Sequence, residues 1–162
     1  MLYKRFFIFL LLAVSLPAFA VHAAAKTYDL ALVTADIPDS CNFMTRDGAL
    51  FVVDEEDHFF TLNIVDRDKN ISLEEYAQKL SQSLKGGPVS KVGEDGWGFL
   101  VKVAVVPFDV LVMADDKHVI ELFTDVDRAE WPEDITKAFN SMKSKTPELA
   151  PLLDRIIASR QK

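Results

Sequence analysis

The chain has 162 residues, of which 18 are basic and 25 acidic, and its formal net charge is −7. A chain this acidic is a poor candidate for binding nucleic acid or an anionic membrane surface, because both carry negative charge. Its single cysteine excludes an internal disulfide, so the fold must rest on a hydrophobic core.

The first 23 residues have the layout of a secretory signal. Lys4 and Arg5 precede an apolar run over residues 6–16, which is shorter than the roughly 20 residues of a membrane span. We predict an exported protein, periplasmic or secreted, that is cleaved near Ala23 and has no membrane span in its mature chain. An uncleaved anchor is the alternative. Cleavage removes Lys4 and Arg5, which leaves 16 basic against 25 acidic residues, a net charge of −9.

Four segments precede the first predicted helix. Residues 27–33 alternate in character and predict a strand, whereas residues 35–47 are rich in turn-forming Pro, Asp, Ser and Asn and predict mostly loop. Residues 49–54 and 58–65 predict a hairpin. The second strand of this hairpin places alternate residues on opposite faces of the sheet.

The apolar period then changes to that of a helix. Ser72 and Glu75 form a capping box, the apolar residues that follow have helical spacing, and a Gly-Gly-Pro sequence ends the stripe. A short strand at residues 89–92 leads into a three-stranded antiparallel meander over residues 97–124. The meander strands are largely apolar on both sides, which indicates a sheet that is covered on both faces.

Two more helices are predicted near the C-terminus. One begins at Pro132, and the other lies within residues 146–162, where Pro151 favours a start one turn later. The predicted fold class is α+β, with a central antiparallel sheet of about six to seven strands covered by helices on both faces. Residues 1–23 are the signal, residues 24–145 form this α/β/α sandwich, and the last helix packs on it or extends from it. The alternative is a one-sided sheet whose second face pairs with another chain.

The stretch between the hairpin and the first helix resembles a calcium loop. Asp66, Asp68 and Asn70 stand at alternate positions, and Glu75 follows on the helix. The glycine that such a loop needs for its sharp turn is replaced by Ile71, and Glu75 becomes a ligand only if two residues are deleted. A polar strand-to-helix turn is therefore the favoured interpretation, and these four residues remain candidate metal ligands.

The other candidate residues are two histidines, two tryptophans and the cysteine. His58 and His118 each follow an acidic turn and would bind a transition metal if the two turns met. Trp97 and Trp131 are either core-edge residues or exposed aromatics of a partner-binding face. Cys41 is either a small buried group or a free thiol that pairs between chains.

The order of elements resembles the PsbP-like α/β/α sandwich family, which includes the extrinsic photosystem protein and bacterial relatives. The similar segments are TYDLALVTADIPDS, FFTLNIVDRDKNISLEEYAQKL and DGWGFLVKV, the last followed by two more strands and ITKAFNSMKS. The chain departs from the family where no Gly-Trp follows Ile37-Pro38, and its C-terminal helix is an addition. The resemblance implies a non-enzymatic module that docks onto a protein partner, and it supplies no catalytic residue.

Nothing in the sequence predicts an enzyme or a cofactor. There is no Gly-x-Ser-x-Gly motif, no histidine near a plausible nucleophile and no glycine-rich phosphate loop. The predicted function is that of an exported protein-binding or assembly module of the cell envelope, with an unknown protein partner. The alternative is a periplasmic protein that binds a small ligand or divalent metal through its acidic turns and the two histidines.

Overall fold

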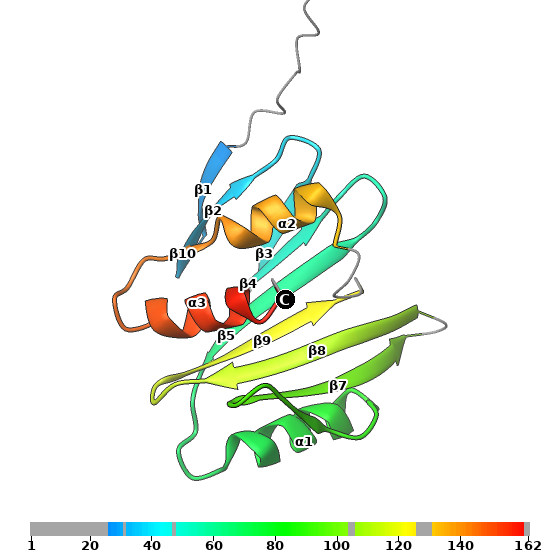
Figure 1. Ribbon diagram of the computed structural model, residues 1–162, viewed down its shortest axis with the longest axis vertical. Coiled ribbons are helices and arrows are strands. Elements are labelled where there is room, and N and C mark those ends of the chain that lie inside the picture. The colour runs from blue at the N-terminus through cyan, green and yellow to red at the C-terminus, as the bar shows by residue number, and fades with distance from the viewer. Residues whose placement is uncertain (1–25, 31, 47, 104–105, 126–130, 161–162) are drawn as a thin grey trace, which may run out of the picture.

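A computed structural model describes residues 26–30, 32–46, 48–103, 106–125 and 131–160, and the predicted signal lies outside these ranges. The large sheet contains β3 (Asn42–Arg46), β4 (Ala49–Val53), β5 (Phe59–Asp66), β6 (Ser90–Val92), β7 (Gly96–Val103), β8 (Val106–Ala114) and β9 (His118–Thr124). The small sheet contains β1 (Lys26–Leu30), β2 (Val33–Ile37) and β10 (Lys143–Ser144). The helices are α1 (Leu73–Ser83), α2 (Glu133–Asn140) and α3 (Ala150–Ala158), as Figure 1 shows.

Two antiparallel sheets form the centre of the structure. The large one has seven strands in the order β3-β4-β5-β9-β8-β7-β6, and the small one has the order β1-β2-β10. The α+β class and the meander of β7, β8 and β9 are confirmed. The single strand predicted at residues 27–33 is wrong, because β1 and β2 form a hairpin there. The loop predicted at residues 35–47 is wrong on both sides of residues 38–41, because β2 ends at Ile37 and β3 begins at Asn42.

The helix ends follow local chemistry. The Ser72 hydroxyl accepts a hydrogen bond from the Glu75 amide at 3.1 Å, which confirms the predicted cap of α1. Helix α2 begins directly after Pro132, which has no amide hydrogen to leave unpaired. Helix α3 begins at Ala150 with Pro151 in its first turn, one turn later than residue 146. In the described ranges, none of these helices is long and apolar enough to cross a membrane.

The buried side chains form two clusters, and alternate residues of β8 belong to different ones. Leu111 and Met113 lie in the larger cluster, with buried residues of α2 and α3. Val110 and Val112 lie in the smaller cluster, with Ala77 of α1. Burial of each large apolar side chain contributes about 2 kcal/mol, so the central strands stabilise the fold through both sides.

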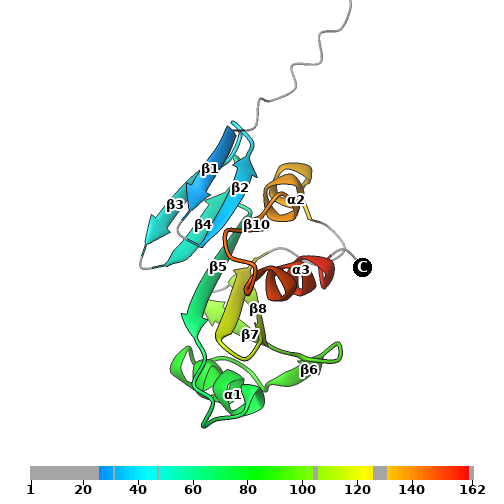
Figure 2. The same ribbon diagram turned by 90° about the vertical axis from the view of Figure 1, so that its left-hand side faces the viewer.

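Burial on both sides does not extend to every strand of the meander. In β7, Phe99 and Val101 are buried, but Leu100 between them is 54% exposed. The prediction of a meander that is buried on both sides is therefore wrong at Leu100 of β7, because α3 lies against β8 and β9 and does not cover this residue. Figure 2 shows α2 and α3 to the right of the large sheet, α1 at its lower end, and no described helix to the left of β3, β4 and β5.

Candidate functional site

An apolar surface covers the side of β3, β4 and β5 that faces away from the larger cluster. In β4, Leu50 and Val52 are buried in that cluster, so the alternating side chains at positions 51 and 53 point the opposite way. In β5, Phe60 is buried in the larger cluster, and its neighbour points to the same open side. We call the resulting surface the aromatic strip; its residues are Met44, Phe51, Val53, Phe59 and Phe108.

The strip takes its residues from β3, β4, β5 and β8, and β9 lies between the last two strands in the sheet. Met44 is the cross-strand partner of Phe51. The ring centroids of Phe51 and Phe59 are 5.4 Å apart, and those of Phe59 and Phe108 are also 5.4 Å apart. Such spacings are typical of aromatic pairs that stabilise one another beyond simple burial. The three rings therefore support one another, and Phe108 also packs against the smaller cluster.

Among the described helices, α1 leaves Phe51 and Phe59 uncovered because of where it lies. Helix α1 contacts β7 and β8, and its apolar side chains pack into the smaller cluster. Phe51 and Phe59 belong to neither buried cluster, and Met44 at the outer end of the strip is 57% exposed. An apolar patch of this kind on a folded protein commonly marks an interaction site.

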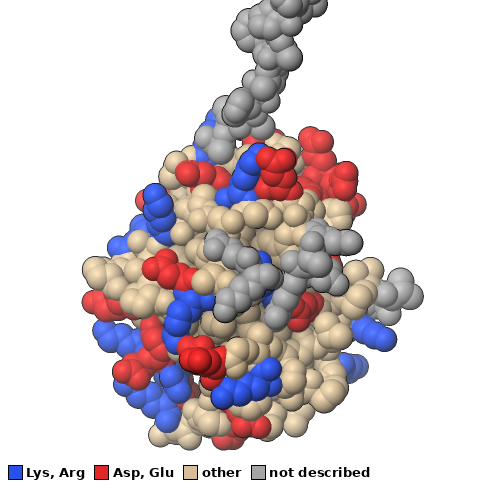
Figure 3. All heavy atoms as spheres, viewed as in Figure 1, with Lys and Arg blue, Asp and Glu red and all other residues tan. Residues whose placement is uncertain are grey.

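An acidic turn borders one end of the strip. Residues 54–57 connect Val53 to β5, and Asp54 shapes the turn by accepting hydrogen bonds from the amides of Glu56 and His58, each at 2.9 Å. Residues 55–57 are exposed. Figure 3 shows acidic side chains gathered at this end of the molecule, at the upper right of the view. The strip is therefore apolar in its middle and negatively charged at this border.

The same acidic end contains a shallow hollow of about 240 Å³. Its acidic lining consists of Asp54, Glu55, Glu56, Glu133 and Asp134. Burial, and then the negative charge of Asp134, raise the pKa of the nearby Cys41 thiol. Cys41 is buried in the larger cluster, so its surroundings favour the unreactive thiol over the thiolate.

The structure does not bring the two candidate histidines together. His118 pairs with Asp66 at one end of β5, whereas His58 directly precedes the other end of this strand. Eight residues of extended strand span roughly 26 Å, so a single ion cannot bind both imidazoles. Each histidine instead lies beside the aspartate of its own turn, with Nδ1 3.4 Å from Asp54 and 3.4 Å from Asp115, respectively.

The turn at His118 is held by Asp115. One oxygen of this carboxylate accepts hydrogen bonds from the amides of Lys117, at 2.6 Å, and His118, at 2.7 Å. Burial would raise the pKa of Asp115, but these bonds and the imidazole outweigh it, so the pKa is lowered from its ordinary value. The acidic side chain at this tip therefore has a structural role in the turn.

The calcium-loop candidates are also occupied by local contacts. Asp68 accepts hydrogen bonds from the backbone and side-chain nitrogens of Asn70, at 2.9 and 2.8 Å. The Glu75 carboxylate lies 2.9 Å from the Lys79 ammonium, one turn along α1. Asp66 lies in β5, opposite His118. In the described ranges, no group of three or more His, Cys, Asp or Glu side chains is arranged to hold a metal ion.

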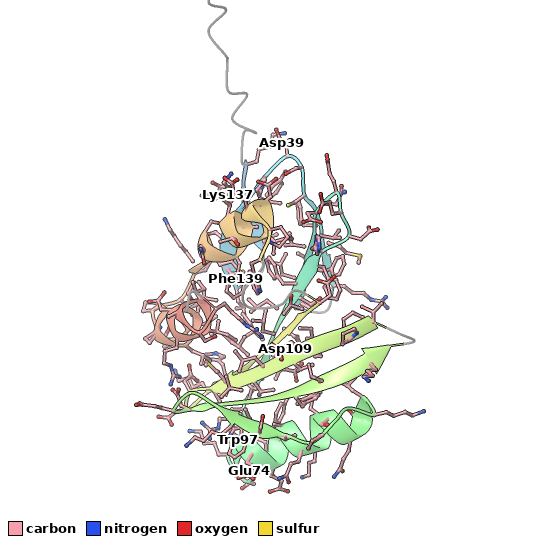
Figure 4. All side chains as sticks on the ribbon, turned by 45° about the vertical axis from the view of Figure 1, so that its right-hand side comes forward. Asp39, Glu74, Trp97, Asp109, Lys137 and Phe139 are labelled. Carbon is pink, nitrogen blue, oxygen red and sulfur yellow. The ribbon has the colours of Figure 1, made fainter. Side chains whose placement is uncertain are left out.

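Both candidate tryptophans pack partly against the core. Trp97 lies against the smaller cluster, on the α1 side of β7, and Figure 4 shows it at this end of the molecule. Trp131 packs edge-on against Phe139, with ring centroids 4.9 Å apart. The Arg160 guanidinium carbon lies 5.9 Å from the Trp131 ring centroid. Neither tryptophan belongs to the aromatic strip, and their role in partner binding stays a prediction.

A second, wider hollow of about 580 Å³ lies over β6 and β7, beside the exposed Leu100. Its volume is in the range of small-molecule sites. Its two carboxylates already have partners: Asp109 pairs with Arg160 at 2.7 Å, and Asp125 accepts a hydrogen bond from the Phe59 amide at 2.9 Å. The hollow therefore offers a ligand mainly apolar contacts.

Sequence reasoning did not single out the aromatic strip. The alternation of β5 was predicted, and the structure confirms it, because Phe60 and Leu62 are buried in the larger cluster. The residues of β3, including Met44, were assigned to a loop. The available signal was the apolar residue Phe59 on the face opposite Phe60, but the sequence does not say which face α1 leaves open.

Comparisons with known proteins establish no family. No protein-family model matches the chain, and no curated protein matches it. A solved crystal structure from Bacteroides thetaiotaomicron VPI-5482 is similar over 77% of this chain, with 10% sequence identity and a TM-score of 0.43. The matched region spans 50% of the length of that Bacteroides chain.

Proposed function

We propose that this is an exported, non-enzymatic module that binds a protein partner at the cell envelope through the aromatic strip. The observation that carries the proposal is the row of half-buried rings of Phe51, Phe59 and Phe108 on one side of the sheet, which ends at the exposed Met44. Aromatic side chains supply much of the binding energy at protein interfaces, and they lose little conformational entropy when they are ordered.

The charge around the strip defines the partner. The strip ends at the acidic turn of residues 54–57, and the whole chain carries a net charge of −7. A partner with an apolar centre and basic residues at one border complements both features. Lysine and arginine also gain from contact with aromatic faces, which adds to the same preference.

We further propose that the domain is an α/β/α sandwich, with α1 on one face of the large sheet and α2 and α3 on the other. Support comes from the membership of alternate β8 side chains in two separate clusters. The resemblance of the sequence to the PsbP-like family supports the same architecture and a docking role. In this arrangement the helices fix the sheet and leave the strip free for a partner.

Site-specific photocrosslinking tests the docking function. Phe59 is replaced by p-benzoylphenylalanine, and the protein is irradiated in the organism that exports it. The control places the same group at Leu100, an exposed apolar residue on the opposite side of the sheet, whereas Phe59 is half-buried. We expect a single adduct of defined mass from position 59 and none from position 100, because only the first position lies in the strip.

A second substitution makes this test specific. Phe51→Ser removes a neighbouring ring of the strip, so the yield of the adduct should fall by roughly tenfold, the scale of a hot-spot residue. Equal adducts from positions 59 and 100, or an adduct that is insensitive to Phe51→Ser, would contradict docking through the strip.

A further inference from the structure

Strand β3 is the last strand of the seven-stranded sheet, and no described strand lies at its outer backbone edge. In the turn that follows β4, the Asp54 amide donates a hydrogen bond to the His58 carbonyl. Hydrogen-bonded pairs recur at every second residue of an antiparallel ladder, so the even-numbered residues of β4 form their backbone hydrogen bonds with β5. Odd-numbered residues of β4 therefore bond to β3, which pairs Met44 with Phe51. Phe43 and Thr45 lie between these bonded pairs, so their amides and carbonyls point outward. In the described ranges no strand pairs with this edge.

The side chains of this edge offer little protection against pairing. Natural proteins usually guard such edges with charges, prolines or bulges. Arg46 at the end of the strand is its single charge, and Met44 in the middle is an exposed apolar residue. The edge is therefore suited to receive another strand.

We infer that β3 pairs antiparallel with β3 of a second copy of this chain, about a twofold axis at Met44. This register lets Phe43 of each copy exchange both backbone hydrogen bonds with Thr45 of the other. It also brings the two Met44 side chains directly opposite each other, at the close spacing of a non-hydrogen-bonded pair. Each copy uses the same surface, as a closed twofold dimer requires.

The charge of Arg46 and that of the acidic turn favour a second copy of the chain as the partner in this register. The pairing places Arg46 of one copy opposite Asn42 of the other. Asn42 pairs with Val53, which directly precedes the acidic turn. Arg46 of each copy thus lies two strand spacings, roughly 10 Å, from Val53 of the other copy, at the start of its acidic turn, where a salt-screened attraction acts. Because the axis is twofold, the same attraction between Arg46 and the acidic turn forms twice in the dimer.

The dimer extends the docking surface, and its existence does not depend on the docking partner. Met44 is the outer end of the aromatic strip, and it contacts the strip of its own copy through its pairing with Phe51. When two copies pair at Met44, their two aromatic strips therefore meet end to end and form one surface. The two seven-stranded sheets become continuous across the axis.

Sedimentation velocity of the purified exported protein tests this inference. We expect a concentration-dependent monomer–dimer equilibrium in the wild-type protein. Thr45→Pro removes an outward amide that β4 does not use, so it should keep the fold but raise the dimer dissociation constant by roughly tenfold or more. Thr45→Val keeps this amide and should leave the equilibrium unchanged. Circular dichroism checks that each variant is folded.

Charge substitutions provide the second arm of the test. Met44→Lys places two like charges opposite each other and should also raise the dissociation constant by at least roughly tenfold. Leu100→Lys is the matched control, since it changes an equally exposed apolar residue on another strand. A wild-type protein that is monomeric at every concentration, or a dimer that withstands both Thr45→Pro and Met44→Lys, would overturn the inference. The first result leaves the crosslink at position 59 unaffected, so the failure of the dimer is distinguishable from the failure of the docking function.

Discussion

Phe60→Ala lowers the free energy of unfolding by about 3–5 kcal/mol, whereas Phe59→Ala lowers it by only about 1–2 kcal/mol. Phe60 is 0% exposed, and its ring packs against Phe139 of α2, with centroids 5.3 Å apart. Its removal leaves a cavity in the larger cluster. Phe59 directly precedes it in β5, but its half-buried ring lies on the other side of the sheet and contacts two other rings of the strip.

Urea unfolding followed by circular dichroism measures this pair of variants. Both changes remove the same ring from adjacent positions of one strand, so each variant is the control for the other. We expect Phe60→Ala to lower the free energy of unfolding at least about twice as much as Phe59→Ala. Equal costs would mean that Phe59 is a core residue and that the strip is not an open surface.

Glu121→Leu lowers the free energy of unfolding by about 2–4 kcal/mol, because it leaves two donors without an acceptor. Glu121 is 5% exposed, in the middle of β9. Its carboxylate accepts a hydrogen bond from the Tyr76 hydroxyl of α1, and another from the side-chain amide of Asn63 in β5 at 2.9 Å. The pair with Tyr76 connects α1 to the sheet, and the bond to Asn63 lies beside the strip.

A double-mutant cycle separates this interaction from other effects. Glu121→Leu and Tyr76→Phe, alone and combined, should give a coupling energy of about 1.5–3 kcal/mol. Glu74→Leu changes an exposed carboxylate on α1 and should shift stability by less than about 0.5 kcal/mol. A coupling energy near zero would contradict the account.

The same cycle has an expected pH dependence. Burial, and then the hydrogen bond and charge of Glu121, raise the pKa of Tyr76 above its ordinary value of 10.0. A raised pKa stabilises the fold at every pH below the unfolded value, and this contribution is lost as the pH rises through the folded value. The coupling should therefore be constant around neutral pH and weaken only in strongly alkaline solution.

Local chemistry made part of the fold predictable. The cap at Ser72, the stop before Gly86 and the β-branched runs of β8 and β9 are short-range patterns, and the structure follows them. Exposure of Leu100 in β7 was not predictable in this way. The sequence shows that both sides of a strand are apolar, but it does not show how far a helix from elsewhere in the chain extends over them.

The errors at the N-terminal side of the domain have a different cause. Turn-forming residues such as Asp39 and Ser40 occupy a real turn, but only a short one between β2 and β3. The pairing of β2 with β10 joins segments about 110 residues apart, which no local pattern encodes. Because β3 was missed, Met44 and the open edge were missed with it, and the candidate site could not be assembled from the sequence.

The most direct test of the central claim is the rate at which dilute hydrogen peroxide oxidises each methionine of the native protein, measured by peptide mass spectrometry. Met44 is 57% exposed at the end of the strip, whereas Met113 is 4% and Met142 is 3% exposed. At a protein concentration low enough for the monomer, the account predicts that Met44 is oxidised many times faster than the other two. Oxidation of Met44 as slow as that of Met113 and Met142 would contradict an open docking surface on this side of the sheet.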